Sequence, residues 1–143
     1  LALHKAQEVA QTCAPEDIVI AADTIVYLDG VILGKPKDTA DAARMLAALS
    51  GREHTVYTGV AVLRGGETRL AAEHTAVRFR TLTPEEITRY IATGEPMDKA
   101  GAYGIQGRGA LFVAHLDGDY FNVMGLPLCR LGQLLNELGV ELL

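Results

Sequence analysis

Helical and strand-like hydrophobic patterns alternate along the chain. Helices are predicted over residues 1–14, 38–49, 83–94 and 127–139. Strand-like runs occupy residues 18–22, 25–28, 31–33, 54–63, 68–79, 111–116 and 120–124. The alternation predicts an α/β fold, with a single domain around a mixed, strongly twisted β-sheet flanked by helices.

Local signals mark several boundaries of these elements. Asp38 or Thr39 can cap the second helix, and Thr83–Glu86 has the form of a capping box with proline at the first helical position. Asp29-Gly30 and Gly65-Gly66 favour tight turns between strands. The last two strand-like runs are expected to pair around Asp117-Gly118.

The first strand and its hairpin contain the first candidate chemistry. The apolar run 18–22 is typical of a strand buried on both faces, and it ends at Asp23-Thr24. The hairpin at Asp29-Gly30 would return the chain to Lys35, so Asp23 and Lys35 are expected on one rim of the sheet. A carboxylate and an ammonium together suit a metal-bound phosphate. A turn-forming aspartate and a solvated lysine remain the alternatives for the two residues taken singly.

A glycine-rich loop is the second candidate. Residues 101–109 contain four glycines, so the backbone can approach a ligand closely, although the spacing is not that of a dinucleotide fingerprint. Gln106 could read a base edge through its amide or could be an ordinary polar loop residue. From its position in the helical pattern alone, Lys5 is expected to be an ordinary surface charge. The four histidines have neither the spacing of zinc ligands nor the partner residues of a catalytic triad.

Composition excludes several classes of function. The chain has 143 residues, and its net charge of -5 argues against general binding of nucleic acid. No run is apolar enough for a membrane span, and no signal peptide is recognisable. Cys13 and Cys129 lie far apart, which predicts reduced thiols in a cytoplasmic protein.

The chain starts within helical periodicity and without methionine, so we expect several tens of residues to precede Leu1.

Eight short motifs resemble those of the Maf family in order and spacing. They are Ala22–Thr24, Leu33–Pro36, Leu49–Arg52 with His54, Tyr57–Val60, Gly94–Pro96, Asp98–Gly107, Gly118–Val123 and Gly125–Pro127. Members of this family are nucleoside-triphosphate pyrophosphatases related in fold to the inosine-triphosphate pyrophosphatases. The resemblance implies hydrolysis of a nucleoside triphosphate to the monophosphate and pyrophosphate. It also implies a divalent cation as cofactor, magnesium first and manganese as the alternative.

The same resemblance suggests roles for individual residues. Asp23 matches the catalytic aspartate, which is the proton acceptor and lies close to the metal. Lys5 and Lys35 match lysines that engage the phosphates, and Thr24 and Gln106 match positions linked to substrate choice. Glutamine at this position is typical of the branch that acts on dTTP and UTP, as a house-cleaning enzyme, rather than on 7-methyl-GTP.

One departure and several alternatives remain at this point. The strand and the Ser-x-Ser-Pro-Arg-Arg loop that open the family's sequence are absent, so residues 1–143 are expected to form a single Maf-like domain lacking both. Alternative functions are a nucleotide-binding regulator of cell division without turnover, an enzyme of the inosine-triphosphate type, and a Maf-type enzyme with another base preference such as 7-methyl-GTP. The expected partner is the nucleoside triphosphate, with neither nucleic acid nor membrane, and a homodimer stays open.

Overall fold

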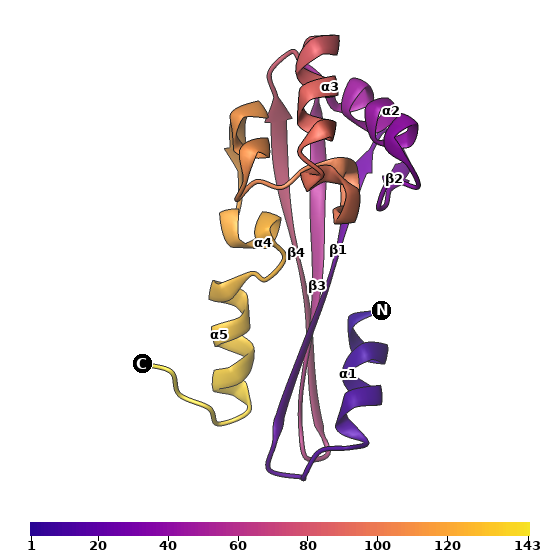
Figure 1. The fold of residues 1–143 in the computed structure, drawn as a ribbon. Coiled ribbons are helices and arrows are strands. Elements are labelled where there is room, and N and C mark those ends of the chain that lie inside the picture. Colours follow the sequence, from indigo (N-terminus) through magenta and orange to yellow (C-terminus); the bar gives the residue numbers. More distant parts are fainter.

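The computed structural model describes all residues, Leu1–Leu143, as a five-stranded sheet with helices around it (Figure 1). The strands are β1 (Ile18–Leu28), β2 (Val31–Leu33), β3 (Glu53–Arg64), β4 (Glu67–Phe79) and β5 (Val113–Asp117). The helices are α1 (Ala2–Ala10), α2 (Thr39–Leu49), α3 (Pro84–Ala92), α4 (Tyr120–Met124) and α5 (Leu128–Glu137), with short 3₁₀ helices η1 (Glu95–Asp98), η2 (Ala100–Ala102) and η3 (Arg108–Phe112). None of the helices combines the length and the apolar character that crossing a membrane requires.

The predicted single α/β domain with a twisted sheet is confirmed, but the sheet is not mixed. Its order is β2-β1-β3-β4-β5, and every neighbouring pair is antiparallel. The turns at Asp29-Gly30 and Gly65-Gly66 reverse the chain between paired strands, whereas parallel neighbours would need a long crossover. Asp29 and Gly30 both have positive φ, as the predicted tight hairpin requires.

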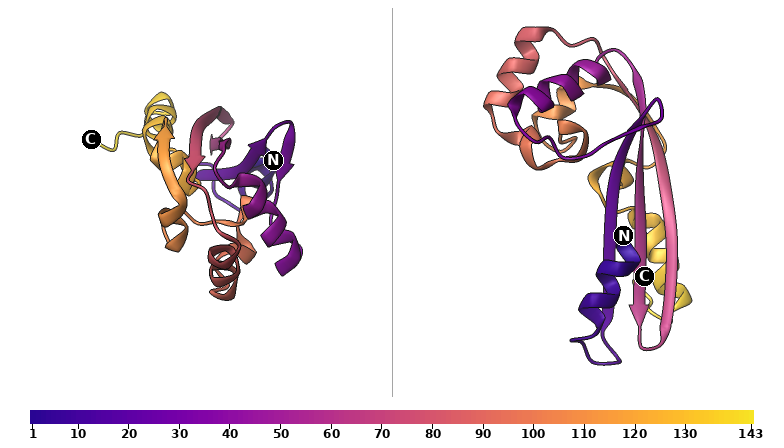
Figure 2. Two further views of the ribbon diagram at one scale, coloured as in Figure 1. Left: turned by 90° about the horizontal axis from the view of Figure 1, so that it is seen from above. Right: turned by 90° about the vertical axis from the view of Figure 1, so that its right-hand side faces the viewer.

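Three groups of helices cover different parts of this long sheet. A helical cap, formed by α2, α3 and η1–η3, packs on one end of the sheet and holds the largest hydrophobic core (Figure 2). At the other end, α1 packs on one face around Ala61, and α5 packs on the opposite face around Val60 and Val62. Neighbouring residues of β3 thus serve two separate cores because side chains alternate along a strand.

The prediction for the first strand was wrong in two respects. β1 does not end at Asp23-Thr24 but continues to Leu28, and Asp23 pairs with Gly59 in the middle of the β1–β3 ladder. The strand is also not buried on both faces, since Ile18 and Ile20 are exposed while Val19 is buried. Two polar residues in mid-strand are tolerated here because they face a cavity instead of a core.

The predicted last pair of strands was also wrong. Only β5 is a strand, and Tyr120–Met124 forms the short helix α4. Asp119 begins this helix by accepting hydrogen bonds from the backbone N–H groups of Phe121 and Asn122, at 2.8 and 3.3 Å. The buried Asn122 amide then donates to the carbonyl oxygen of Val56 and to Oγ1 of Thr75, at 3.1 and 2.9 Å. These tertiary hydrogen bonds outweigh the strand propensity of the aromatic sequence.

Candidate functional site

A cavity of about 310 Å³ opens between the sheet, the helical cap and α4. It is lined by the middle of β1, by Lys35 after β2, by the loop from Lys99 to Gly107, and by residues 123–125 at the end of α4. Four of the residues singled out from the sequence, Asp23, Thr24, Lys35 and Gln106, lie in this one lining.

The cavity extends over a free edge of β1. Asp23 and Thr24 are adjacent in a strand, so their side chains point to opposite faces of the sheet, yet both line the cavity. This is geometrically allowed because β2 pairs with β1 only from Val26 onward. A ligand in the cavity can therefore contact the two faces of β1 at the same time.

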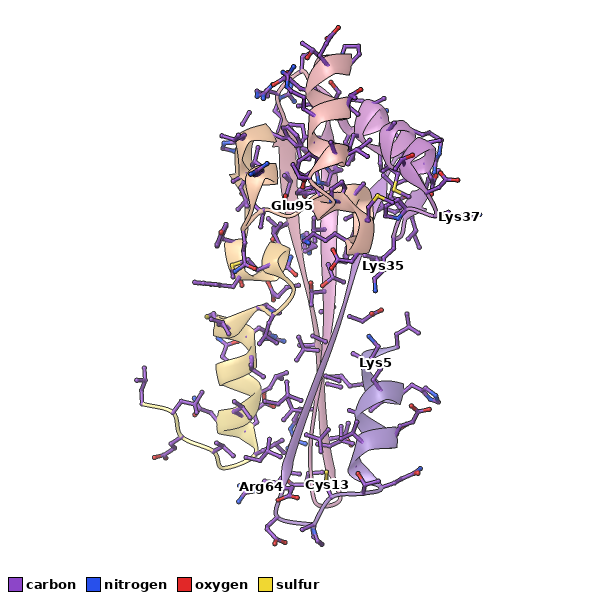
Figure 3. The ribbon with its side chains drawn as sticks, viewed as in Figure 1. Lys5, Cys13, Lys35, Lys37, Arg64 and Glu95 are labelled. Atoms are coloured by element: carbon purple, nitrogen blue, oxygen red, sulfur yellow. The ribbon has the colours of Figure 1, made fainter.

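The Asp23 side of the cavity is charged. Lys5 on α1 places Nζ 3.0 Å from Oδ1 of Asp23. Figure 3 shows Lys5 and Lys35 pointing from opposite sides into the gap between α1 and the helical cap. Gly59, which pairs with Asp23, has open space where a side chain would stand, so the carboxylate stays accessible. The backbone beside Lys35 is fixed, since the carbonyl oxygen of Gly34 accepts from the N–H of Gly101 at 3.1 Å.

The Thr24 side is a mostly apolar slot with a few polar groups. Oγ1 of Thr24 lies 2.9 Å from Oγ1 of Thr58, and this buried Thr58 hydroxyl donates to the carbonyl oxygen of Asn122 at 2.9 Å. The apolar walls come from Val26, Val56, Ile105, Val123 and Met124. The exposed Gln106 brings the loop's amide to this slot. Apolar walls with sparse polar groups are typical of a pocket for a flat organic ring.

A family model described as "Maf-like protein" matches residues 1–138. The chain belongs to the Maf-like family. A protein of Moorella thermoacetica named dTTP/UTP pyrophosphatase is 58% identical over 99% of this chain and 73% of its own length. A protein of Symbiobacterium thermophilum with the same name is 57% identical over 97% of the chain and 71% of its own length. A third dTTP/UTP pyrophosphatase, from Bacillus cytotoxicus, is 59% identical over 92% of the chain and 68% of its own length.

This Maf-like chain offers a metal ion one carboxylate rather than a complete set of ligands. No group of three or more His, Cys, Asp or Glu side chains could hold a metal, and Asp23 is the single acidic residue in the cavity lining. Lys5 contacts Oδ1 of Asp23, and no hydrogen bond engages Oδ2. Mg²⁺ is usually held by one or two carboxylates with water and substrate phosphates, so this sparse donor set fits magnesium bound together with a triphosphate.

Sequence reasoning missed two residues at the cavity, Lys99 and Tyr103. Lys99 lines the cavity while its Nζ donates to Oδ1 of Asp98 at 2.9 Å and to the carbonyl oxygen of Glu95 at 3.2 Å. Tyr103 forms part of the wall, and its hydroxyl lies 2.7 Å from Nε2 of the buried His54. Both Lys99 and Tyr103 fall inside the motif Asp98–Gly107, but spacing alone does not indicate which of its side chains line the cavity.

His54, to which no role was given from the sequence, lies behind the cavity wall in the Maf-like fold. It is 2% exposed, and its Nδ1 has no hydrogen-bond partner. Burial lowers the pKa of His54 from 6.5 to about 4. The imidazole is therefore neutral at pH 7 and packs edge-on against Phe79 at 5.1 Å between ring centroids.

We expect the stability of the fold to fall between pH 7 and pH 5 because of His54. In this range the unfolded chain takes up a proton at His54 and the folded chain does not, since its pKa lies near 4 rather than 6.5. The loss begins as the pH drops below about 6.5 and amounts to about 2 kcal/mol at pH 5. Urea unfolding at the two pH values measures it. His54→Gln should remove most of this loss, whereas His74→Gln, at an exposed site, should retain it.

Proposed function

We propose that this chain is a nucleoside-triphosphate pyrophosphatase that hydrolyses dTTP and UTP to the monophosphate and pyrophosphate with the help of a divalent cation. One observation carries the proposal. A cavity with Asp23, Lys35 and the adjoining Lys5 at one side, and a mostly apolar slot with Thr24 and Gln106 at the other, occurs in a chain 58% identical to a dTTP/UTP pyrophosphatase. The charged side suits a triphosphate, and the slot suits a base.

The lysines would act on the charge of the triphosphate. Attack of water on the α-phosphorus builds negative charge on phosphate oxygens, and ammonium groups fixed nearby offset it without rearranging. The backbone beside Lys35 is fixed by the hydrogen bond of the Gly34 carbonyl oxygen, and the ammonium group of Lys5 contacts Asp23. Because the two lysines come from separate parts of the fold, they can engage different phosphate groups of one triphosphate.

Asp23 would orient the attacking water and accept its proton. Its carboxylate projects from the middle of a fully paired segment of the β1–β3 ladder, so its position is fixed by the sheet rather than by a mobile loop. Asp23 would also hold the divalent cation, with Mn²⁺ as an alternative to Mg²⁺. When bound, the metal ion supplies positive charge that polarises the phosphate oxygens.

Gln106 and Thr24 would choose the base. An amide donates and accepts at once, which matches the adjacent N–H and carbonyl groups on the pairing edge of uracil and thymine. The hydroxyl of Thr24 is already bonded to Thr58, so it presents a fixed polar group to the slot. We place the enzyme in the cytoplasm, where its two free cysteines, Cys13 and Cys129, would stay reduced.

The test is hydrolysis of UTP and dTTP by the purified full-length protein with magnesium. We expect UMP and pyrophosphate in equal amounts, because attack at the α-phosphorus releases the two terminal phosphates together. Chromatography of the products distinguishes this from UDP and inorganic phosphate, which would indicate a different reaction. Tight binding of UTP without any product would instead favour the regulatory, non-catalytic alternative.

A further inference from the structure

We propose that Glu95 is a positioning residue that holds the loop carrying Gln106 and thereby sets the selectivity for the base. This inference rests on the proposed function, because it assumes that Gln106 reads the base. Glu95 does not line the cavity itself. In Figure 3 it lies within the helical cap, away from the gap into which Lys5 and Lys35 point.

The carboxylate of Glu95 binds the C-terminal part of the loop directly. Oε1 accepts from the backbone N–H of Arg108 at 2.9 Å, and Oε2 accepts from the N–H of Gly109 at 3.0 Å. Oε2 also accepts from the hydroxyl of Tyr90. That hydroxyl in turn accepts from the N–H of Gly104 at 3.0 Å. Both ends of the segment 104–109, with Gln106 between them, are therefore held by one carboxylate and the hydroxyl bound to it.

The glycines of the loop fit around this carboxylate. A Cβ atom at Gly107 would overlap Oε1 of Glu95. At Gly109 a Cβ atom would lie 2.5 Å from the carbonyl oxygen of Gly104 and 2.9 Å from the Tyr90 hydroxyl. Glycine at Gly107 and Gly109 is thus required by the close approach of the loop to Glu95 and Tyr90, which links the sequence pattern of the loop to an acidic residue outside it.

The ionised form of Glu95 is the one that the loop requires. Burial raises its pKa, but hydrogen bonds from Tyr90, Arg108 and Gly109, together with the charge of Lys99, outweigh burial and leave the pKa below its usual value. A carboxylate accepts at both oxygens, whereas a glutamine amide accepts at one atom and donates from the other. In Glu95→Gln the NH₂ group would face at least one N–H donor of the loop, whichever way the amide is turned.

Glu95→Gln therefore tests the inference with almost no change in shape. UTP and CTP differ at the base edge that Gln106 would contact. The ratio of kcat/KM for UTP to kcat/KM for CTP therefore measures how strongly the enzyme selects the base. We expect Glu95→Gln to lower this ratio by about tenfold, as the loss of one positioned hydrogen bond would. Most of the change should be in KM for UTP, with kcat at saturation changing less, because Asp23 and the lysines are untouched. Gln106→Ala should lower the ratio in the same direction.

Glu86→Gln is the matched control. Glu86 is another hydrogen-bonded carboxylate of the helical cap. It accepts from the guanidinium of Arg80 and from the backbone N–H of Thr83, and it does not contact the loop. Glu86→Gln should lower the melting temperature and leave the UTP to CTP ratio within twofold of the wild type. If Glu95→Gln fails to fold, Tyr90→Phe removes the hydroxyl that bridges Glu95 and Gly104 while keeping the ring, and the same drop in ratio is expected.

A folded Glu95→Gln with an unchanged ratio would overturn the inference, and so would a wild-type chain that does not distinguish UTP from CTP. Affinities for UMP and CMP, measured by calorimetry, distinguish failure of the Glu95 inference from failure of the proposed pyrophosphatase function. A wild type that binds UMP more tightly than CMP but hydrolyses nothing would contradict the pyrophosphatase proposal. Loss of that preference in Glu95→Gln would still support the positioning role.

Discussion

Asp23→Asn is expected to lower kcat for UTP by at least about 100-fold, the scale usual for a positioned acid–base group. The substitution keeps the shape of the side chain but removes the charge that, in the proposed mechanism, orients the water and holds the metal ion. The fold should be little affected, because the Asp23–Lys5 pair is solvent-accessible and such pairs contribute less than about 1 kcal/mol to stability. Steady-state kinetics with magnesium, together with a melting curve, measures both effects.

Asp29→Asn provides the matched control for that experiment. Asp29 belongs to the same hairpin and also has a basic partner, Arg52, but it is more exposed than Asp23 and does not line the cavity. Its φ of 48° is one that asparagine tolerates well. The kcat of Asp29→Asn should stay within twofold of the wild-type value. An Asp23→Asn enzyme that retained more than a tenth of the wild-type kcat would remove Asp23 from the proposed mechanism.

Phe79→Ala is expected to cause the largest loss of stability, about 3–5 kcal/mol. Phe79 is 1% exposed, and its ring centroid lies 4.7 Å from that of Tyr103, 5.1 Å from His54 and 5.8 Å from Phe112. Truncation would remove three aromatic contacts and leave a cavity that β4 cannot close by shifting, because β4 is paired on both sides. Urea unfolding followed by circular dichroism is suitable, since the chain has no tryptophan.

Phe121→Ala is the comparison for Phe79→Ala. Phe121 is 44% exposed on α4, so its truncation should cost less than about 1 kcal/mol. Similar losses for the two variants would show that the aromatic cluster around Phe79 does not dominate the core of the helical cap.

Features that depend on neighbours in the sequence could be predicted. The N-terminal cap of α2 by Asp38, the capping box of α3 at Thr83–Glu86 and the hairpin at Asp29-Gly30 all form as expected. Each of these is decided by a few adjacent residues and their backbone angles, so tertiary packing has little left to change. The resemblance of the motifs similarly indicated the residues that meet in the cavity, although their roles remain predictions.

Features that depend on distant partners could not be predicted. Asp23 was expected at the end of a strand because a carboxylate usually interrupts an apolar run, and nothing local reveals that β3 continues to pair beside it. The helix α4 depends on the hydrogen bonds of Asn122 to β3 and β4, which local strand propensity does not register. The contacts of Glu95 with the loop likewise join residues 13 and 14 positions apart in the sequence.

The free edge of β1 gives strand register a direct chemical meaning in this protein. Asp23 faces the charged side of the cavity and Thr24 faces the mostly apolar slot only because ten residue pairs hold β1 against β3 in one alignment. A slip of one residue would exchange the two faces, bringing the carboxylate to the apolar slot and the hydroxyl to the charged side. Point substitutions at either residue could therefore retune chemistry or selectivity separately during evolution. Insertion or deletion of a single residue in β1 would disturb both the chemistry and the selectivity at the same time.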